Sequence, residues 1–308
     1  MPFLRSLFIA LSRNRVMRRF SEHSAVGARL SSRFVAGMQI EDALRVAAAL
    51  NAQGIAVTLD SLGESVTTAA EARQAAEIYH QLLDAIEARQ LNANISVKLT
   101  QMGLELDPRL AEEIAGELAA HAARIGSFLR IDMEDSSLTD VTLEIVRRLH
   151  ARPELAGAIG IVIQAYLYRS SADIEQLMQE RIRVRLCKGA YKEPAAVAFP
   201  LKSDVDKNYA MLAQTLLTSG LFHGIATHDE RMIAAIRAYT RDKGIAAASF
   251  EFQMLYGVRR DLQRELVQEG FGMRVYVPFG QEWYPYFMRR LAERPANVLF
   301  IARNFFRK

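Results

Sequence analysis

Short runs of β-branched and aliphatic residues recur along the chain, and a longer stretch of mixed polar and apolar residues follows most of them. The short runs predict buried strands, whereas the stretches rich in Ala, Leu, Glu and Arg predict helices. The eight predicted strands are 55–59, 95–99, 128–131, 160–165, 184–187, 225–227, 250–253 and 275–277. The clearest helices between them are predicted over 67–90, 108–125, 139–150 and 229–243.

This alternation decides the fold class. Strands that are separated by helices of such length must pair in parallel, because a tight hairpin cannot join them. Eight evenly spaced units predict an α/β fold, a distorted (β/α)8 TIM-like barrel over residues 34–308. No G-x-G-x-x-G follows the first strand, so an open dinucleotide-binding sheet has no support, and an all-helical repeat leaves the β-branched runs unexplained.

Residues 1–33 differ from the rest in charge. They contain seven arginines and one glutamate, a net charge of +6, whereas the whole chain carries +4 and the remainder therefore −2. This asymmetry argues against a nucleic-acid-binding surface on the barrel. The apolar residues on one face of the predicted helical arm are Phe3, Leu4, Leu7, Phe8 and Leu11. Such a helix either lies on an anionic membrane or docks on its own barrel or a second subunit, and the pattern alone slightly favours docking.

Two further features of the sequence bear on where in the cell the protein is expected. No stretch approaches the roughly 20 apolar residues of a membrane span. The single cysteine, Cys187, cannot form an internal disulfide and usually behaves as a small buried apolar residue. We therefore expect a cytoplasmic protein.

Polar residues stand at the predicted strand ends, where barrel enzymes build their active sites. They are Asp60, Lys98, Asp132, Gln164, Arg185, Lys188, His228, Glu251, Gln253 and Tyr276. Cations dominate this set, which favours an anionic ligand such as a carboxylate or phosphate. A strand-end lysine, Lys98 or Lys188, serving as a Schiff-base nucleophile is an alternative. No metal is expected, because the close pair His223 and His228 falls on opposite strand faces.

The predicted final helix, which begins near Pro285, carries a polar face made by Tyr286, Arg289, Arg290 and Glu293 at helical spacing. An ordinary outer helix would leave this face in water. If the helix instead covers the barrel mouth, the two adjacent guanidiniums form a fork for a substrate carboxylate.

Nine segments in this order resemble the proline dehydrogenase family, specifically its small monofunctional bacterial members. They are RFVAG (33–37), LDSLGE (59–64), SVKL (96–99), RIDME (130–134), QAY (164–166), RLCKGAY (185–191), ATH (226–228), EFQ (251–253) and YxxRR (286–290). The resemblance implies non-covalent FAD on the strand ends and oxidation of L-proline to Δ1-pyrroline-5-carboxylate. It also implies that electrons pass to a membrane quinone, so residues 1–20 would contact the inner face of the cell membrane.

The resemblance also assigns roles. Asp132 and Arg185 would be catalytic, with Arg185 beside the reactive flavin nitrogen. Proline would be surrounded by Lys98, Asp132, Leu255, Tyr276, Tyr286, Arg289 and Arg290. FAD would be held by Met133, Gln164, Arg185, Lys188, Gly189, Ala190, Thr227 and His228. Glu64 would pair with Arg289 as a gate.

The chemistry agrees with these roles. Hydride loss beside nitrogen is easier from a neutral amine, and a cationic wall would lower the amine's pKa. The alternatives are another flavin barrel related to folate reductases, against which the paired arginines argue, and a non-catalytic anion-binding barrel. A separate pyrroline-5-carboxylate dehydrogenase is a possible partner.

Overall fold

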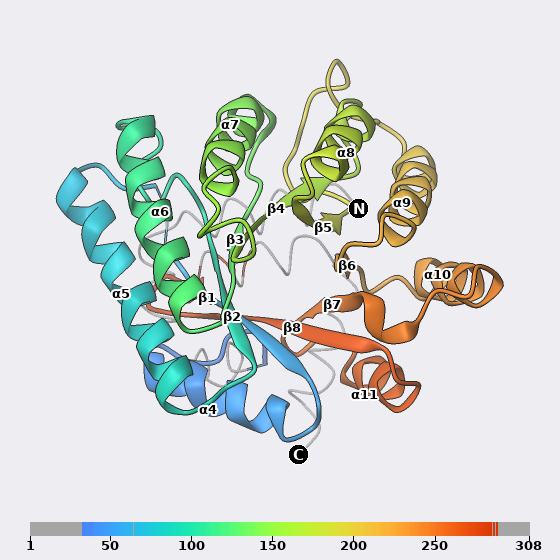
Figure 1. Ribbon diagram of the computed structural model, residues 1–308, viewed down its shortest axis with the longest axis horizontal. Helices are drawn as coiled ribbons and strands as arrows, with labels where there is room; N and C mark the ends of the chain where they lie inside the picture. Colours follow the sequence, from blue (N-terminus) through green and yellow to red (C-terminus); the bar gives the residue numbers. More distant parts are fainter. Residues whose placement is uncertain (1–32, 64, 285, 287, 289–308) are drawn as a thin grey trace.

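The computed structural model describes residues 33–63, 65–284, 286 and 288. Eight parallel strands close into a barrel in the order β1 to β8, and β8 pairs with β1 (Figure 1). The strands are β1 (Ala56–Ser61), β2 (Ala93–Val97), β3 (Leu129–Ile131), β4 (Ile159–Gln164), β5 (Arg183–Cys187), β6 (Gly224–Ala226), β7 (Glu251–Leu255) and β8 (Gly272–Phe279). The predicted (β/α)8 barrel is therefore confirmed, and the strand bounds differ from the prediction by a few residues.

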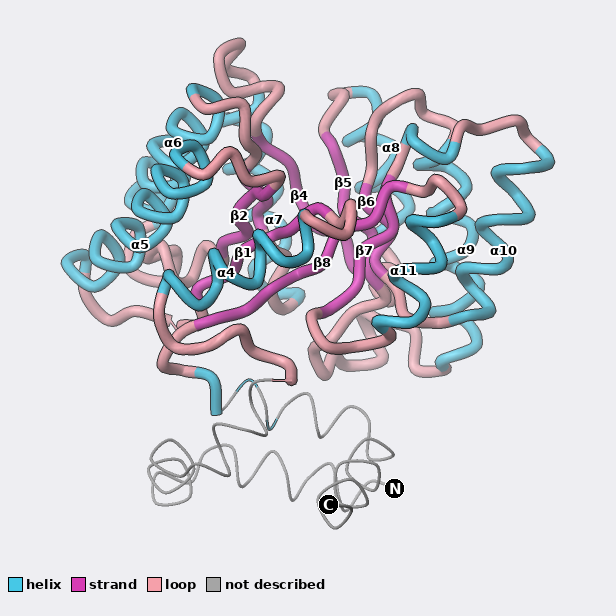
Figure 2. The backbone as a smooth tube through the Cα atoms, turned by 90° about the horizontal axis from the view of Figure 1, so that it is seen from below, coloured by secondary structure: helices cyan, strands magenta, loops and turns pink. Residues whose placement is uncertain are grey.

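Helices form a ring around the strands in Figure 1 and flank them in Figure 2. They are α4 (Ile40–Asn51), α5 (Ala69–Ala88), α6 (Pro108–Arg124), α7 (Thr139–His150), α8 (Ser170–Gln179), α9 (Lys202–Leu217), α10 (Glu230–Asp242) and α11 (Arg260–Gln268). Helix α4 precedes the first strand and packs on both β1 and β8. It therefore covers the seam between the first and the last strand of the barrel.

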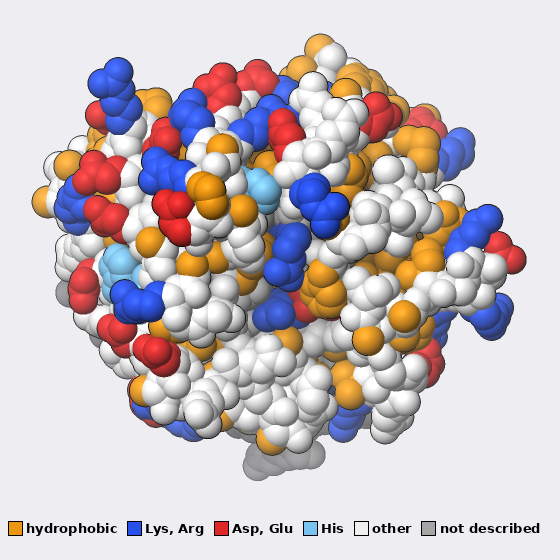
Figure 3. All heavy atoms as spheres, in the orientation of Figure 1, with side chains coloured by type: hydrophobic (Ala, Val, Ile, Leu, Met, Phe, Trp, Pro, Cys, Tyr) orange, Lys and Arg blue, Asp and Glu red, His pale blue; other side chains and the backbone are white. Residues whose placement is uncertain are grey.

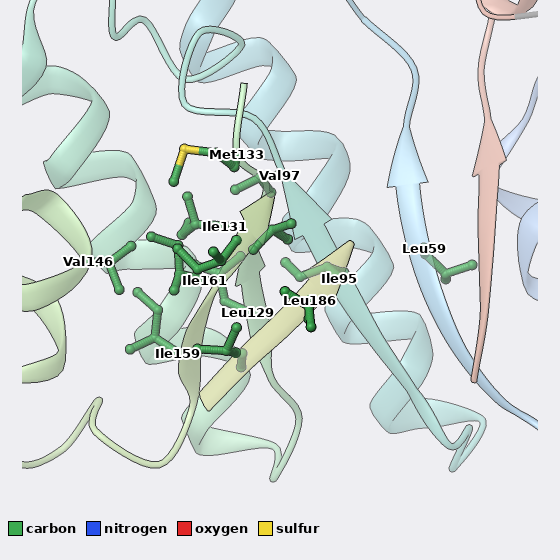
Figure 4. Close-up of a cluster of buried hydrophobic side chains, with 14 of the residues drawn as sticks. Leu59, Ile95, Val97, Leu129, Ile131, Met133, Val146, Ile159, Ile161 and Leu186 are labelled. Atoms are coloured by element: carbon green, nitrogen blue, oxygen red, sulfur yellow. The ribbon is translucent and has the colours of Figure 1, made fainter. Parts of the chain in front are cut away.

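An aliphatic layer lies between the strands and the helices. Val146 of α7 packs toward Ile131 of β3 and Ile159 and Ile161 of β4 (Figure 4). The strand residues that alternate with this layer point inward, and they are largely polar. Thr58 of β1, for example, accepts a hydrogen bond from Arg185 of β5 across the barrel. The sequence pattern of β-branched residues thus marks the outer face of the sheet, and the interior is left for polar chemistry.

The outer surface mixes both charge signs. Acidic and basic side chains alternate over the helices on the face shown in Figure 3. Many pair between neighbouring helices, as Arg73 of α5 does with Glu113 of α6 at 2.7 Å and Arg89 with Glu41 of α4 at 2.7 Å. Among the described residues, no helix is long and apolar enough to cross a membrane.

Candidate active site

One carboxylate lies at the centre of the candidate site. Asp132 directly follows β3, and its Oδ1 accepts hydrogen bonds from Ser96 Oγ at 2.6 Å and Arg185 Nη1 at 2.9 Å. Its Oδ2 accepts from the Tyr276 hydroxyl at 2.8 Å and lies 4.0 Å from Lys98 Nζ. Side chains of β2, β5 and β8 therefore converge on Asp132, together with Lys98, which directly follows β2. The rim of a barrel allows this convergence.

Lys98 is held between two acids. Its Nζ lies 3.2 Å from Oδ1 of Asp60, a β1 residue that is 1 % exposed. Burial by itself would lower the pKa of Lys98, but Asp60 and Asp132 outweigh burial and raise that pKa above the ordinary lysine value. Lys98 is therefore a cation at neutral pH. A Schiff-base nucleophile must be a neutral amine, so this geometry argues against that alternative for Lys98.

The phenol of Tyr276 is a neutral donor. Burial, together with the nearby carboxylates of Asp132 and Asp60, raises its pKa well above the ordinary tyrosine value. The guanidinium carbon of Arg185 lies 5.3 Å from the centre of the Tyr276 ring, a cation–π distance. Leu255, at the end of β7, is the register partner of Tyr276, so the predicted apolar contact stands beside the predicted phenol.

The charges of this centre balance. Lys98 and Arg185 face the carboxylates of Asp60 and Asp132. The sequence predicts a cationic wall, but the described residues of the centre carry no excess positive charge. The further cations of the prediction, Arg289 and Arg290, lie outside the described residues, as do Glu64 of the predicted gate and the arm over 1–20.

The residues predicted to hold a cofactor lie at the carboxyl ends of β3, β4, β5 and β6, except Arg185, which lies within β5. Gln164 ends β4, donates to the Glu134 carbonyl at 2.7 Å and accepts from the Ala190 backbone N–H at 3.3 Å. Glu134 is held by Thr100, whose hydroxyl donates to it at 2.5 Å, and burial raises the Glu134 pKa. Gln164 is therefore locked between the β3 end, where Met133 is buried, and the loop after β5.

The loop after β5 begins at Lys188. The Lys188 ammonium pairs with Asp206 at 2.5 Å and Asp229 at 2.7 Å, which argues against its use as a free amine nucleophile. Gly189 has φ +117°, and a Cβ there would lie 2.3 Å from the Tyr166 ring. The chain can follow this path only with glycine.

The ends of β6 and β7 are tied together. Thr227 accepts a hydrogen bond from the Asp229 N–H at 3.1 Å, and His228 Nε2 accepts from the Leu255 N–H at 2.8 Å. The acceptor role leaves the other ring nitrogen of His228 to carry the proton when the ring is neutral.

One expectation changes with the structure. Glu251 is the first residue of β7 and not its last, so it lies at the amino end of the barrel, away from the rim. Tyr286 is buried in an apolar cluster with Phe34, Val35 and Trp283.

The histidines that lie close together in the structure are not the pair that is close in the sequence. His223 bonds to the Val184 N–H and Ser219, whereas His80 of α5 and His121 of α6 lie 2.8 Å apart between their Nδ1 atoms. Within the described part of the chain, no group of three or more metal-binding side chains forms.

Sequence reasoning gave no role to Ser96 and Tyr79. Ser96 stands two residues before Lys98, so the period of two along a strand could have placed both on one face. Tyr79 comes from α5, and its hydroxyl lies 3.4 Å from Asp60 and 3.3 Å from Gln101. No local pattern signals that a helix residue reaches a carboxylate in the barrel.

A family model described as Proline dehydrogenase matches residues 43–303. The chain belongs to the proline dehydrogenase family. It is 43% identical over 306 residues to Proline dehydrogenase 1 of Bacillus subtilis (strain 168), covering 99% of this chain and 100% of that protein. Proline dehydrogenase of Deinococcus radiodurans is 43% identical over 277 residues, 89% of each chain. The resemblance inferred from the nine segments is thus confirmed, and a proline dehydrogenase function is supported.

Solved structures of proline dehydrogenase relatives agree in fold. Proline utilization A (PutA) from Bdellovibrio bacteriovorus, inactivated by N-propargylglycine, aligns with a TM-score of 0.83 at 25% identity, over 95% of this chain. This chain spans 36% of that one. It likewise spans 24% of the bifunctional PutA of Escherichia coli (strain K12), at 29% identity.

Proposed function

We propose that this chain oxidises L-proline to Δ1-pyrroline-5-carboxylate with non-covalently bound FAD. The observation that carries the proposal is the convergence of Lys98, Arg185 and Tyr276 on Asp132 in a barrel of this family. Proline presents a carboxylate and an amine, so its site needs both cationic and anionic groups. The centre around Asp132 supplies both.

The donor set at the ends of β4, β5 and β6 fits a flavin cofactor. Gln164 and Lys188 supply an amide and an ammonium, and Gly189 keeps the backbone open where a side chain would strike Tyr166. Carbonyl and phosphate groups are bound by such donors. The residues expected to hold FAD are Met133, Gln164, Arg185, Lys188, Gly189, Ala190, Thr227 and His228. When bound, FAD would supply the acceptor for the hydride that proline loses.

The protein side chains bind and orient proline. The oxidation removes a hydride from the ring carbon beside nitrogen and a proton from the nitrogen. Lys98 remains cationic, so it can pair with the substrate carboxylate, for which Arg289 and Arg290 provide the proposed fork. Tyr276 stays a neutral phenol that donates to Asp132 and can pack on the substrate ring, together with Leu255 and Tyr286. Glu64 and Arg289 would close the site.

We further propose that the electrons pass to a membrane quinone and that residues 1–20 contact the inner face of the cell membrane. The basic residues and apolar face of that segment support this setting. The bifunctional name of the Escherichia coli relative supports a link with a pyrroline-5-carboxylate dehydrogenase.

An absorption spectrum of the purified protein tests the proposal. We expect a flavin spectrum that bleaches when L-proline is added without oxygen. The Arg185→Ala variant should keep its flavin but bleach more slowly, because a positive charge beside the reacting nitrogen is lost. A protein without flavin would indicate an anion-binding barrel, and a flavin that proline fails to reduce would indicate another flavin oxidoreductase.

A further inference from the structure

A chain of buried hydrogen bonds starts at Arg185 and runs away from the candidate active site toward the amino end of the barrel. Arg185 Nε donates to Gln253 Oε1 at 2.5 Å, and Gln253 Nε2 donates to Glu251 Oε1 at 2.6 Å. Arg274 Nε donates to the same Glu251 oxygen at 2.7 Å. Arg185, Gln253 and Glu251 are each at most 6% exposed, so water does not compete for these bonds.

These hydrogen bonds can form in only one orientation of the Gln253 amide. The Gln253 amide has an accepting end and a donating end, whereas Arg185 only donates and the Glu251 carboxylate only accepts. A flipped amide would set donor against donor at Arg185 and acceptor against acceptor at Glu251. Buried unsatisfied groups of this kind are costly, so Glu251 dictates which end of Gln253 faces Arg185.

Residues on neighbouring strands hold the side chains of Gln253 and Glu251 in place. A Cβ on Gly224 of β6 would lie 2.3 Å from Gln253 Nε2, so the glycine leaves the space that the amide fills. On the other side, Arg274 of β8 also donates to the Val57 carbonyl of β1 at 2.7 Å. Glu251 therefore faces a cation that is itself anchored, and this contact holds its carboxylate in place.

We propose that Glu251, acting through Gln253, is a positioning residue that sets the orientation of the Arg185 guanidinium. The inference rests on the proposed function, which places Arg185 beside the flavin. The Nη atoms of Arg185 reach Asp132, Ser96 and Thr58, and the Nε bond to Gln253 fixes the rotation of the same plane. A guanidinium that turns away would stabilise the reduced flavin less.

Two variants test this role in the flavin-loaded protein. Gln253→Leu removes the acceptor for Arg185 Nε. The double variant Glu251→Met/Arg274→Met removes both charges together, so that neither is left buried and unpaired. We expect each to slow flavin reduction by proline about 10-fold, since small displacements of catalytic groups cost up to about 100-fold. The flavin midpoint potential should fall, whereas the KM for proline should stay within about 2-fold of the wild type.

Combining the two sets of substitutions tests whether Glu251 and Gln253 act on Arg185 through one route. If Glu251 acts through Gln253, adding the double substitution to Gln253→Leu should slow reduction no further. Asn51→Ala is the matched control, because it removes hydrogen bonds to the Ile55 and Asn92 carbonyls at the same end of the barrel. It should lower the melting temperature without moving the flavin potential.

The outcomes separate the two proposals. A wild-type protein without proline-reducible flavin would overturn the proposed function and this inference together. Flavin-loaded variants with the wild-type potential and reduction rate would overturn this inference alone. Additive effects of the two variants would also overturn it. If the double variant does not fold, the flavin potential of Gln253→Leu is compared with that of Asn51→Ala. Equal potentials of these two variants would overturn the inference.

Discussion

The Asp132 carboxylate receives donors from three strands, and each donor approaches it from a different side of the barrel. A hydrogen bond to a charged group contributes about 1.5 to 3 kcal/mol, so this residue also holds the barrel rim together. The same contacts present an anion, a phenol and two cations to a substrate in one place. In the proposed function, binding of proline and stability of the rim would therefore depend on the same side chains.

His223 shows the opposite case, a titratable residue used for structure. It is fully buried, and its Nδ1 accepts a hydrogen bond from the Val184 N–H at 3.0 Å, which requires a neutral ring. Burial, and then Arg130 and Arg183, lower the pKa of His223 from 6.5 to about 3. Between these values the unfolded chain binds a proton that the native protein does not. We therefore expect the free energy of unfolding to fall as pH falls below about 6.5, by on the order of 1 kcal/mol per pH unit.

Urea unfolding at pH 7 and pH 5 measures this dependence. In the His223→Gln variant the amide can accept from Val184 and donate to Ser219 without titrating. The variant should lose less stability than the wild type between the two pH values. An equal loss in both proteins would show that other groups dominate the acid sensitivity.

The proposed cofactor site is formed by strand ends and the loops after them. The loop after β5 turns at Gly189, which has φ +117° and lies against Tyr166. The Gly189→Ala variant should weaken FAD binding, because the added Cβ must displace either the ring or the backbone beside Lys188 and Ala190. Titration of the flavin-free protein with FAD measures the change, and we expect at least a 10-fold loss, about 1.4 kcal/mol.

Gly244→Ala is the matched control. Gly244 directly follows the C-cap of α10 with φ +65°, and no atom would lie within 4 Å of its Cβ. Alanine there costs about 1 kcal/mol of backbone strain and leaves FAD affinity unchanged. Equal FAD affinities of the two variants would contradict a cofactor role for the loop after β5.

Considered as a whole, the molecule combines a basic arm of +6 with a remainder of −2. Deleting residues 1–20 should lower turnover with quinone in anionic vesicles and spare turnover with a soluble dye. Each arginine near such a surface contributes on the order of 1 kcal/mol, less at high salt. The two proteins are compared by co-sedimentation with vesicles at low and high salt. Equal sedimentation would exclude a membrane role, and loss of stability or of both activities would favour docking on the barrel.

The sequence by itself determined the barrel and its eight strands, and it placed several polar side chains at the strand ends. Strand periodicity and helix composition are local properties, and the carboxyl ends of parallel strands must meet at one rim. The positions of Lys98, Asp132 and Gln164 on this rim could therefore be predicted from the sequence. Glu251 was misplaced because a shift of a few residues in a strand boundary moves a side chain from one end of the barrel to the other.

Only the tertiary structure decided which side chains meet. Asp60 neutralises Lys98, Tyr79 reaches Asp60 from a helix, and Arg185 crosses the barrel to Thr58. These contacts join residues 19 to 127 positions apart. The contacts of Asp60 join consecutive elements, whereas the contact of Arg185 with Thr58 depends on barrel closure, which brings the distant strands β5 and β1 to face each other across the interior. The balanced charge of the site and the bonded chain from Arg185 to Glu251 follow from that closure, because burial forces each polar group to find a partner across the interior.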